Sequence, residues 1–179
     1  MFKETLRILS LLELQPKIKG RKKIQKVFFL LKHLGYDVPF HYSYHFYGPY
    51  SEELQVELTS KAGLKLWKEE YKKKWGYIYT ANNKKILEFK EHLGKITDEV
   101  TVPQPYPREL VERLINTDVE VLELTSTLGY FIEQDYGSDK INAYSRAREE
   151  TLKLKQNLEG KMQQAEKLYE DLQKERKSA

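Results

Sequence analysis

The four histidines of this 179-residue chain are its first candidates for chemistry, as ligands of a metal ion. They are His33, His41, His45 and His92. On a helix, the i, i+4 spacing of His41 and His45 would chelate a metal ion such as zinc. The aromatic segment 36–50 that contains them predicts an extended backbone instead, in which this spacing separates the side chains by roughly 13 Å. We therefore expect loop histidines and no metal site.

Sequence motifs for other kinds of catalysis are absent. The chain has no Cys, which excludes disulfides, thiolate zinc sites and cysteine nucleophiles. It also has no phosphate-cradling glycine-rich loop, no G-x-S-x-G elbow and no H-E-x-x-H helix. Neighbouring acids such as Glu69-Glu70 and Glu149-Glu150 occur in charge-rich runs that are typical of a solvated surface. We expect a protein that binds rather than catalyses, and no cofactor.

Lysines can act by neutralising a polyanion, and they are unevenly distributed. Residues 1–80 hold 15 Lys and Arg against 8 Asp and Glu. The corresponding counts are 6 against 11 in residues 81–136, and 10 against 8 in residues 137–179. The basic first segment is the one expected to meet a nucleic acid. The alternative is a solvated, lysine-rich surface without a partner.

The basic segment contains three predicted helices. The first runs from Phe2 to Leu14 and ends before Pro16. The second runs from Arg21 to Leu34 and has one apolar and one lysine-rich face. The apolar face consists of Ile24, Val27, Phe28, Leu31 and Leu34, and the lysine-rich face of Lys22, Lys23, Lys26 and Lys32. The third begins at Ser51, which caps it, and ends before Gly63.

A β-hairpin is predicted after these helices. From Leu64 to Thr80 apolar and polar residues alternate with a period of two, which indicates two antiparallel strands. The tip between them carries Lys72, Lys73 and Lys74. We expect packing roles for Trp67, Trp75, Tyr77 and Tyr79. A further helix starts near Asn82 or Asn83, and a linker with three prolines, residues 100–107, marks the end of the basic segment.

The second half of the chain is predicted to be helical. A short helix opens near Pro107 or Arg108, and another runs from Val119 to Tyr136. Nothing except Gly160 then interrupts a helix from about residue 139 to residue 176, which would be about 57 Å long. Its end has a heptad-like seam formed by Leu158, Met162, Ala165, Tyr169 and Leu172. This seam could pack on its own domain, fray in solvent, or join two chains in a coiled coil, and we expect a dimer.

Together these elements predict an α+β, mostly α protein. Residues 1–100 would form a winged helix-turn-helix-like domain with a lysine-rich hairpin, and residues 101–179 a helical region with a long C-terminal helix. No stretch approaches the roughly 18 apolar residues that a membrane span needs, so we expect a cytoplasmic protein.

Two motifs in the first domain resemble a known family. Gly20 to Lys26 reads G-R-K-K-I-Q-K, and His45 to Leu54 reads H-F-Y-G-P-Y-S-E-E-L. In this order they resemble the bacterial and archaeal YwgA-type proteins and, more distantly, the antitoxin-type domain with a G-x-x-K-L-Q-K helix and a G-P turn. The resemblance covers residues 20–54 and implies a winged-helix-like domain, but no activity.

The first functional hypothesis is a regulator-like protein that binds double-stranded DNA. In a helix-turn-helix the second helix enters the major groove, but here the helix after Ser51 presents the acids Glu52, Glu53 and Glu57. Phosphate contacts are therefore expected from Lys22, Lys23, Lys26, Lys72, Lys73 and Lys74. The alternative is a protein-interaction module whose contact surface contains Tyr44, Tyr47 and Tyr50.

Overall fold

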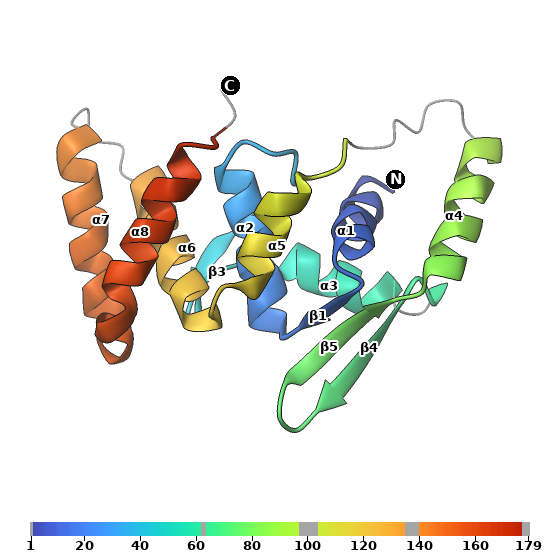
Figure 1. Ribbon diagram of the computed structural model, residues 1–179, viewed down its shortest axis with the longest axis horizontal. Coiled ribbons are helices and arrows are strands. Elements are labelled where there is room, and N and C mark those ends of the chain that lie inside the picture. The colour runs from blue at the N-terminus through green and yellow to red at the C-terminus, as the bar shows by residue number, and fades with distance from the viewer. Residues whose placement is uncertain (1, 62–63, 97–103, 135–139, 177–179) are drawn as a thin grey trace.

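The chain is mostly helical and carries two small antiparallel sheets (Figure 1). The computed structural model describes residues 2–61, 64–96, 104–134 and 140–176. The strands are β1 (Lys17–Lys19), β2 (Ser43–His45), β3 (Gly48–Tyr50), β4 (Trp67–Lys72) and β5 (Gly76–Ala81). The helices are α1 (Lys3–Leu14), α2 (Arg21–His33), α3 (Glu52–Lys61), α4 (Asn83–Ile96), α5 (Arg108–Asn116), α6 (Val119–Gln134), α7 (Lys140–Leu154), the 3-10 helix η2 (Gln156–Lys161) and α8 (Met162–Gln173). The predicted α+β, mostly α class is confirmed, as are the three N-terminal helices and the hairpin.

The larger sheet has the strand order β1-β5-β4, and all its pairings are antiparallel. Ile18 and Glu69 both pair with Tyr79, the central residue of β5. The β4–β5 hairpin extends beyond the helices and ends in a free tip (Figure 1). The smaller sheet is the β2–β3 hairpin, in which Tyr44 pairs with Pro49.

Helix α2 lies at the centre of the molecule and is surrounded on several sides. Every residue from Ile24 to Leu31 is buried, because α5, α6, β1, β3 and β5 all pack against this helix. The first hydrophobic cluster joins α1 and α2 to residues beyond 100, namely Tyr106, Leu110, Val111, Leu114 and Leu122. Residues on both sides of the expected boundary at 100/101 therefore contribute to one core.

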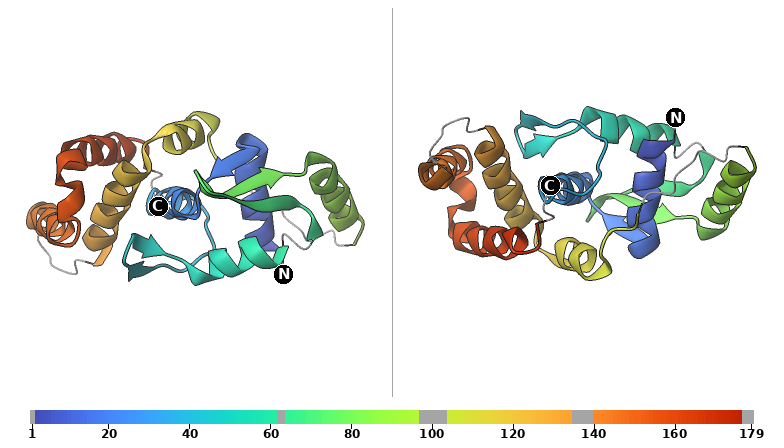
Figure 2. Two further views of the ribbon diagram at one scale, coloured as in Figure 1. Left: turned by 90° about the horizontal axis from the view of Figure 1, so that it is seen from below. Right: turned by 90° about the horizontal axis from the view of Figure 1, so that it is seen from above.

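The predicted long C-terminal helix is wrong, because the chain turns back through η2. Helices α7 and α8 run side by side in opposite directions and both pack on α6, at the end of the molecule opposite α4 (Figures 1 and 2). At the turn, the buried amine of Lys155 pairs with Glu123 of α6. This contact is the physical reason for the break, since an uninterrupted helix would extend beyond α6.

The heptad-like seam is buried inside its own chain. Leu158, Met162, Ala165 and Tyr169 join Val121, Leu124 and Leu128 of α6 in the second hydrophobic cluster. Leu172 belongs to the first cluster, and Leu168 packs against both. His33 of α2 also contacts this region, through Tyr169 (3.2 Å) and Glu133 (2.6 Å). Of the three alternatives for the seam, the structure shows the one in which it packs on its own chain.

Candidate functional site

The lysines of the larger sheet gather on one of its two faces. The register places Lys17, Thr80 and Lys68 in one row across the three strands. Because side chains alternate along a strand, Lys19 and Lys72 share this face, and Ile18, Tyr79 and Trp67 point to the opposite, buried side. We call the exposed Lys17, Lys19, Lys68 and Lys72, with Lys73 and Lys74 at the tip, the lysine face. The sequence predicted only its last three members.

Negative charge on the lysine face is small. Among the described residues of the three strands, Glu70 is the one acid on this side, where it pairs with Lys72 (2.6 Å) and Lys68 (3.7 Å). The hydrogen bond from Lys72 holds the pKa of Glu70 below its usual value. Glu69 points to the other side and accepts hydrogen bonds from Arg21 (3.1 Å) and Tyr79 (2.9 Å). The strands therefore carry four lysines and one carboxylate on this side, and the turn adds Lys73 and Lys74.

The tip of the hairpin exposes one aromatic ring on each face. Trp75 is 47% exposed, with the amines of Lys19 and Lys74 at 4.2 and 4.8 Å from its ring centroid. Tyr71 is 64% exposed on the opposite face, and its ring meets that of Tyr77 edge-on. The prediction of packing roles is confirmed for Trp67 and Tyr79, which are buried, and for Tyr77, which packs against the first hydrophobic cluster. Trp75 is half-exposed and packs against lysine side chains.

Arg21 holds the hairpin against α2. Its guanidinium lies 3.5 Å from the ring centroid of Tyr77 and pairs with Glu69 of β4. One residue earlier, the Gly20 amide donates a 2.7 Å hydrogen bond to the Tyr77 carbonyl. The position of the lysine face relative to the helices is therefore fixed by contacts with both strands.

The three helix lysines that were predicted to contact phosphates all make internal contacts. Lys22 pairs with Glu123 at 2.8 Å. Lys23 donates to the carbonyls of Ile115 and Thr117 at the end of α5, where a cation is favourable. Lys26 is 1% exposed, and its amine donates to the Pro49 carbonyl at 2.6 Å. The prediction that Lys26 faces solvent is wrong, because α6 and β3 cover that side of α2.

Lys22 and Lys26 belong to a charge cluster around the buried carboxylate of Glu123. Lys22 binds one carboxylate oxygen of Glu123 and Lys155 binds the other, each at 2.8 Å. Although burial opposes the shift, hydrogen bonds from Lys155 and Lys22 hold the pKa of Glu123 below its usual value. Burial lowers the pKa of Lys26 to about 7, with Lys155 and Lys22 adding to the shift and Glu123 opposing it. The cluster joins α2, α6 and the α7–η2 turn.

The two sequence motifs meet at this cluster and have structural roles there. Gln25 of the first motif exchanges two hydrogen bonds with the backbone of Ser51 in the second. Gly48 has a φ of +82°, and a Cβ atom at this position would lie 2.5 Å from the Thr127 hydroxyl of α6. Sequence reasoning missed Glu123, Thr127 and Lys155, because no local pattern connects them to residues 20–54.

The three candidate tyrosines of the second motif have different environments. Tyr44 is half-buried between Phe131 and Tyr130, with ring centroids 5.2 and 5.9 Å away. Tyr50 is half-buried beside His45. Tyr47 is exposed at the hairpin tip next to Phe46, which is 83% exposed. The tip of β2–β3 is thus the exposed aromatic part of this segment.

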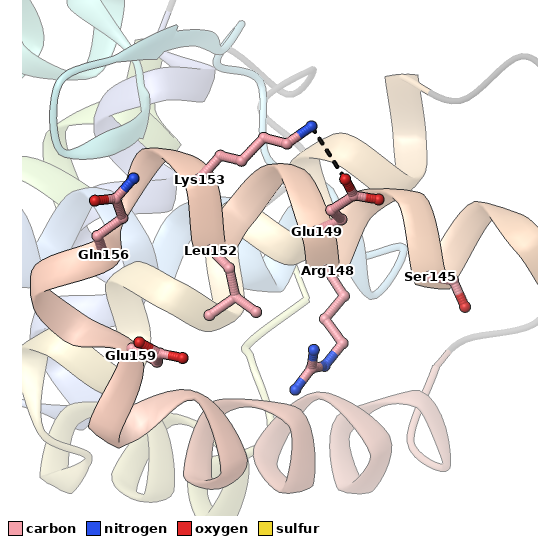
Figure 3. Close-up of a pocket in the computed structure, with 7 residues that line it drawn as sticks. All are labelled: Ser145, Arg148, Glu149, Leu152, Lys153, Gln156 and Glu159. Atoms are coloured by element: carbon pink, nitrogen blue, oxygen red, sulfur yellow. Dashed lines mark ion pairs between the residues drawn. The ribbon is translucent and has the colours of Figure 1, made fainter.

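Surface depressions also lie away from the lysine face and the charge cluster. One of about 580 Å³ lies along α7 and the start of the following turn (Figure 3). Its charged side chains neutralise each other or their neighbours, since Lys153 pairs with Glu149 and Arg148 with Glu166. Within the described part of the chain, no three His, Asp or Glu side chains are grouped as a metal site would need. No helix in that part is long and apolar enough to cross a membrane.

The fold thus combines a basic face on the larger sheet with the helices α5 to α8. The resemblance to YwgA-type proteins extends well beyond the two sequence motifs. The chain is 28% identical over 143 residues to uncharacterized protein YwgA of Bacillus subtilis (strain 168). These aligned residues make up 79% of this chain and 83% of that protein. No protein-family model matches the chain. No solved structure matches it either. The chain is thus similar to YwgA over most of its length.

Proposed function

We propose that this chain is a winged-helix-type protein that binds nucleic acid through the lysine face and has no catalytic activity. The element order α1–β1–α2–α3–β4–β5 and the sheet order β1-β5-β4 support this proposal, because a winged helix has the same order, and β4–β5 would be its wing. The insertion between α2 and α3, which includes the β2–β3 hairpin, is much longer than a usual helix-turn-helix connection. The distant antitoxin-type resemblance and the cytoplasmic location remain predictions.

The excess of exposed lysine on the sheet is the observation that carries this proposal. Lysine side chains neutralise phosphates and release condensed counterions, which gives affinity without sequence preference. The side chains of Lys68 and Lys72 are more than half exposed, so their amines can exchange Glu70 for a phosphate. Surface ion pairs of this kind contribute little stability, so the exchange costs little.

Helix α3 is poorly suited to bind in the major groove of DNA. Its exposed residues include Glu52 and Glu53, and the half-buried Glu57 accepts a hydrogen bond from Thr5. Their charges oppose a phosphate backbone. Near its start, the His41 amide and ring bind Glu53 and hold the pKa of that carboxyl low. The proposed contact is therefore made by the sheet and the wing, away from α3.

The test is fluorescence anisotropy of labelled oligonucleotides, single-stranded and duplex, titrated at two salt concentrations. We expect binding that weakens steeply as salt rises. Combined replacement of Lys72, Lys73 and Lys74 by Ala should weaken it on every sequence and reduce the salt slope by up to about 3. A matched control replaces the exposed Lys153, Lys167 and Lys174 by Ala and should change neither. The absence of binding at low salt, or equal effects of both triple variants, would refute the proposal.

A second candidate function is protein recognition by the β2–β3 tip. The exposure of the adjacent Phe46 and Tyr47 favours it, since large aromatic residues are enriched among interface hot spots. Tyr44 is a poor test position because it packs on α6. Joint replacement of Phe46 and Tyr47 by Ser should abolish capture of a partner while the melting temperature stays unchanged. Retained capture by this variant would exclude the tip as the contact surface.

A further inference from the structure

The two tryptophans of the chain have opposite environments on the same hairpin. Trp67 is fully buried and its indole N–H donates to the Leu58 carbonyl at 2.9 Å. Trp75 lies in the turn, half-exposed, and supports no hydrophobic cluster among the described residues. A large ring that is half-exposed, contributes to neither hydrophobic cluster and is covered by flexible lysine side chains is available for a ligand.

Trp75 belongs to the lysine face rather than to the opposite one. The amine of Lys19, a strand residue of that face, lies 4.2 Å from its ring centroid, and Lys74 lies at 4.8 Å. Because both amines lie over the ring, a flat group that stacks on Trp75 displaces at least one of them, and the displaced lysine side chain stays within reach of an adjoining phosphate. Aromatic stacking next to flexible cations is the combination that binds a base together with its phosphate.

Base faces are accessible in a single strand but hidden in a duplex. In a double helix each base stacks on its neighbours, so an exposed tryptophan gains nothing unless the stack is opened. A helix-turn-helix that reads duplex sequence would also place α3 in the major groove, and α3 presents acids there. Binding of a single strand to the lysine face needs no such helix, because the strand can lie along the exposed side of the sheet while its phosphates contact lysine side chains.

We therefore propose that the ligand of the lysine face is single-stranded nucleic acid, with one base stacked on Trp75. This rests on the proposed function and narrows it to one ligand class. Phosphates on either side of the stacked base reach Lys19 and Lys74, and the strand continues along the row that contains Lys17 and Lys68. Tyr71 takes no part, because it points away from this face.

Tyr71 provides a matched control for Trp75. Both are exposed aromatic residues of the same hairpin, and they differ in the face on which they lie. We expect Trp75→Ala to weaken binding of a single strand by about tenfold or more, and Trp75→Phe to retain most of the affinity. Tyr71→Ala should change the affinity less than about twofold. Melting temperatures of all three variants report whether the hairpin remains folded.

The binding experiment uses the full chain with three unlabelled probes of 12 nucleotides or base pairs: oligo-dT, oligo-U and a mixed-sequence duplex. Tryptophan fluorescence gives the readout, since a base stacked on Trp75 quenches it, whereas the buried Trp67 is shielded. We expect quenching by one or both single strands at concentrations at which the duplex gives none. The quench should vanish in Trp75→Phe, although this variant still binds, as the fluorescence anisotropy of the same oligonucleotides carrying a label will show.

The outcomes separate this inference from the proposed function. Binding of no probe at low salt would overturn both. Duplex binding as tight as single-strand binding, or equal losses in Trp75→Ala and Tyr71→Ala, would overturn the single-strand inference and leave the proposed function standing. A preference for oligo-U over oligo-dT, or the reverse, identifies RNA or DNA as the source of the strand.

Discussion

Gln25 and Ser51 exchange two hydrogen bonds of 2.9 Å across the junction between α2 and α3. The side-chain amide of Gln25 donates to the Ser51 carbonyl, and the Ser51 amide donates to the Gln25 side-chain carbonyl. Both residues are buried. The Ser51 hydroxyl in turn accepts from the Leu54 amide and caps α3. One glutamine thus fixes the start of α3 relative to the central helix and joins the two motifs in space.

Replacing Gln25 by Met should destabilise the protein by about 2 kcal/mol or more, because it leaves two buried backbone groups without partners. Urea unfolding followed by circular dichroism measures the change. Gln164→Met, at an exposed position of α8, is the control and should alter the stability by less than about 0.5 kcal/mol. Equal, small effects at both positions would mean that water replaces the lost partners.

Gly48 and Gly76 both have positive φ, but only Gly48 is crowded. Ala at Gly76 meets nothing within 4 Å and should cost about 1–2 kcal/mol from the left-handed backbone alone. Ala at Gly48 has the same backbone penalty, and its Cβ would also lie 2.5 Å from the Thr127 hydroxyl, so it should cost about 1–3 kcal/mol more. Thermal and urea unfolding of the two variants compare them. Similar losses would show that the β2–β3 hairpin can move away from α6.

The stability contribution of Lys26 should rise with pH above neutrality. Burial lowers its pKa to about 7, against about 10.4 in an unfolded chain. Between these values the unfolded chain binds more protons, so the folded state gains stability as pH rises, by up to about 1.4 kcal/mol per unit. Below pH 7 both states are protonated and the burial penalty is complete.

The measurement is the unfolding free energy of the unsubstituted protein minus that of Lys26→Met, from pH 6 to pH 9.5. The difference should be flat at the acid end and rise above about pH 7. The facing groups Lys22, Glu123 and Lys155 are present in both proteins, so their own titration largely cancels. Lys153→Met, at an exposed lysine, should give a flat difference throughout. A flat curve for Lys26→Met would show that its ammonium stays charged inside the fold.

Ala165→Leu should destabilise the single chain by about 1–3 kcal/mol through overpacking, because Ala165 is fully buried against α6. The loss should be the same at protein concentrations that differ a hundredfold. Gln164→Leu, one residue earlier on the exposed side, should have little effect. If the seam joined two chains, the stability of the unsubstituted protein would instead rise with its concentration.

The local patterns predicted those parts of the fold that local residues determine. The alternation in residues 64–80 gave the hairpin and its lysine-rich tip, and Ser51 and Pro16 marked real helix ends. The complete lysine face was not predictable, because Lys17 and Lys19 join it only through the pairing of β1 with β5. Strand pairing over some sixty residues has no signature in a single sequence.

The errors concern residues whose environment comes from distant segments. The sequence pattern predicted one lysine-rich face for helix α2. The uninterrupted apolar run of residues 27–31 indicates instead that the helix is buried on all sides, and Lys26 is buried beside this run. The break after Leu154 follows from the pairing of Lys155 with Glu123, which lies 32 positions earlier. Since nothing near Lys155 is a strong helix breaker, propensity alone favoured a continuous helix.

The position of Leu168, in contact with both hydrophobic clusters, has a thermodynamic consequence. Side chains shared between two cores couple their melting, so the wing-bearing part and the α6–α8 part should unfold together in a single transition. A strand of nucleic acid bound to the lysine face would then protect amide hydrogens of α7 and α8 from the exchange that occurs by global unfolding, although it contacts neither helix.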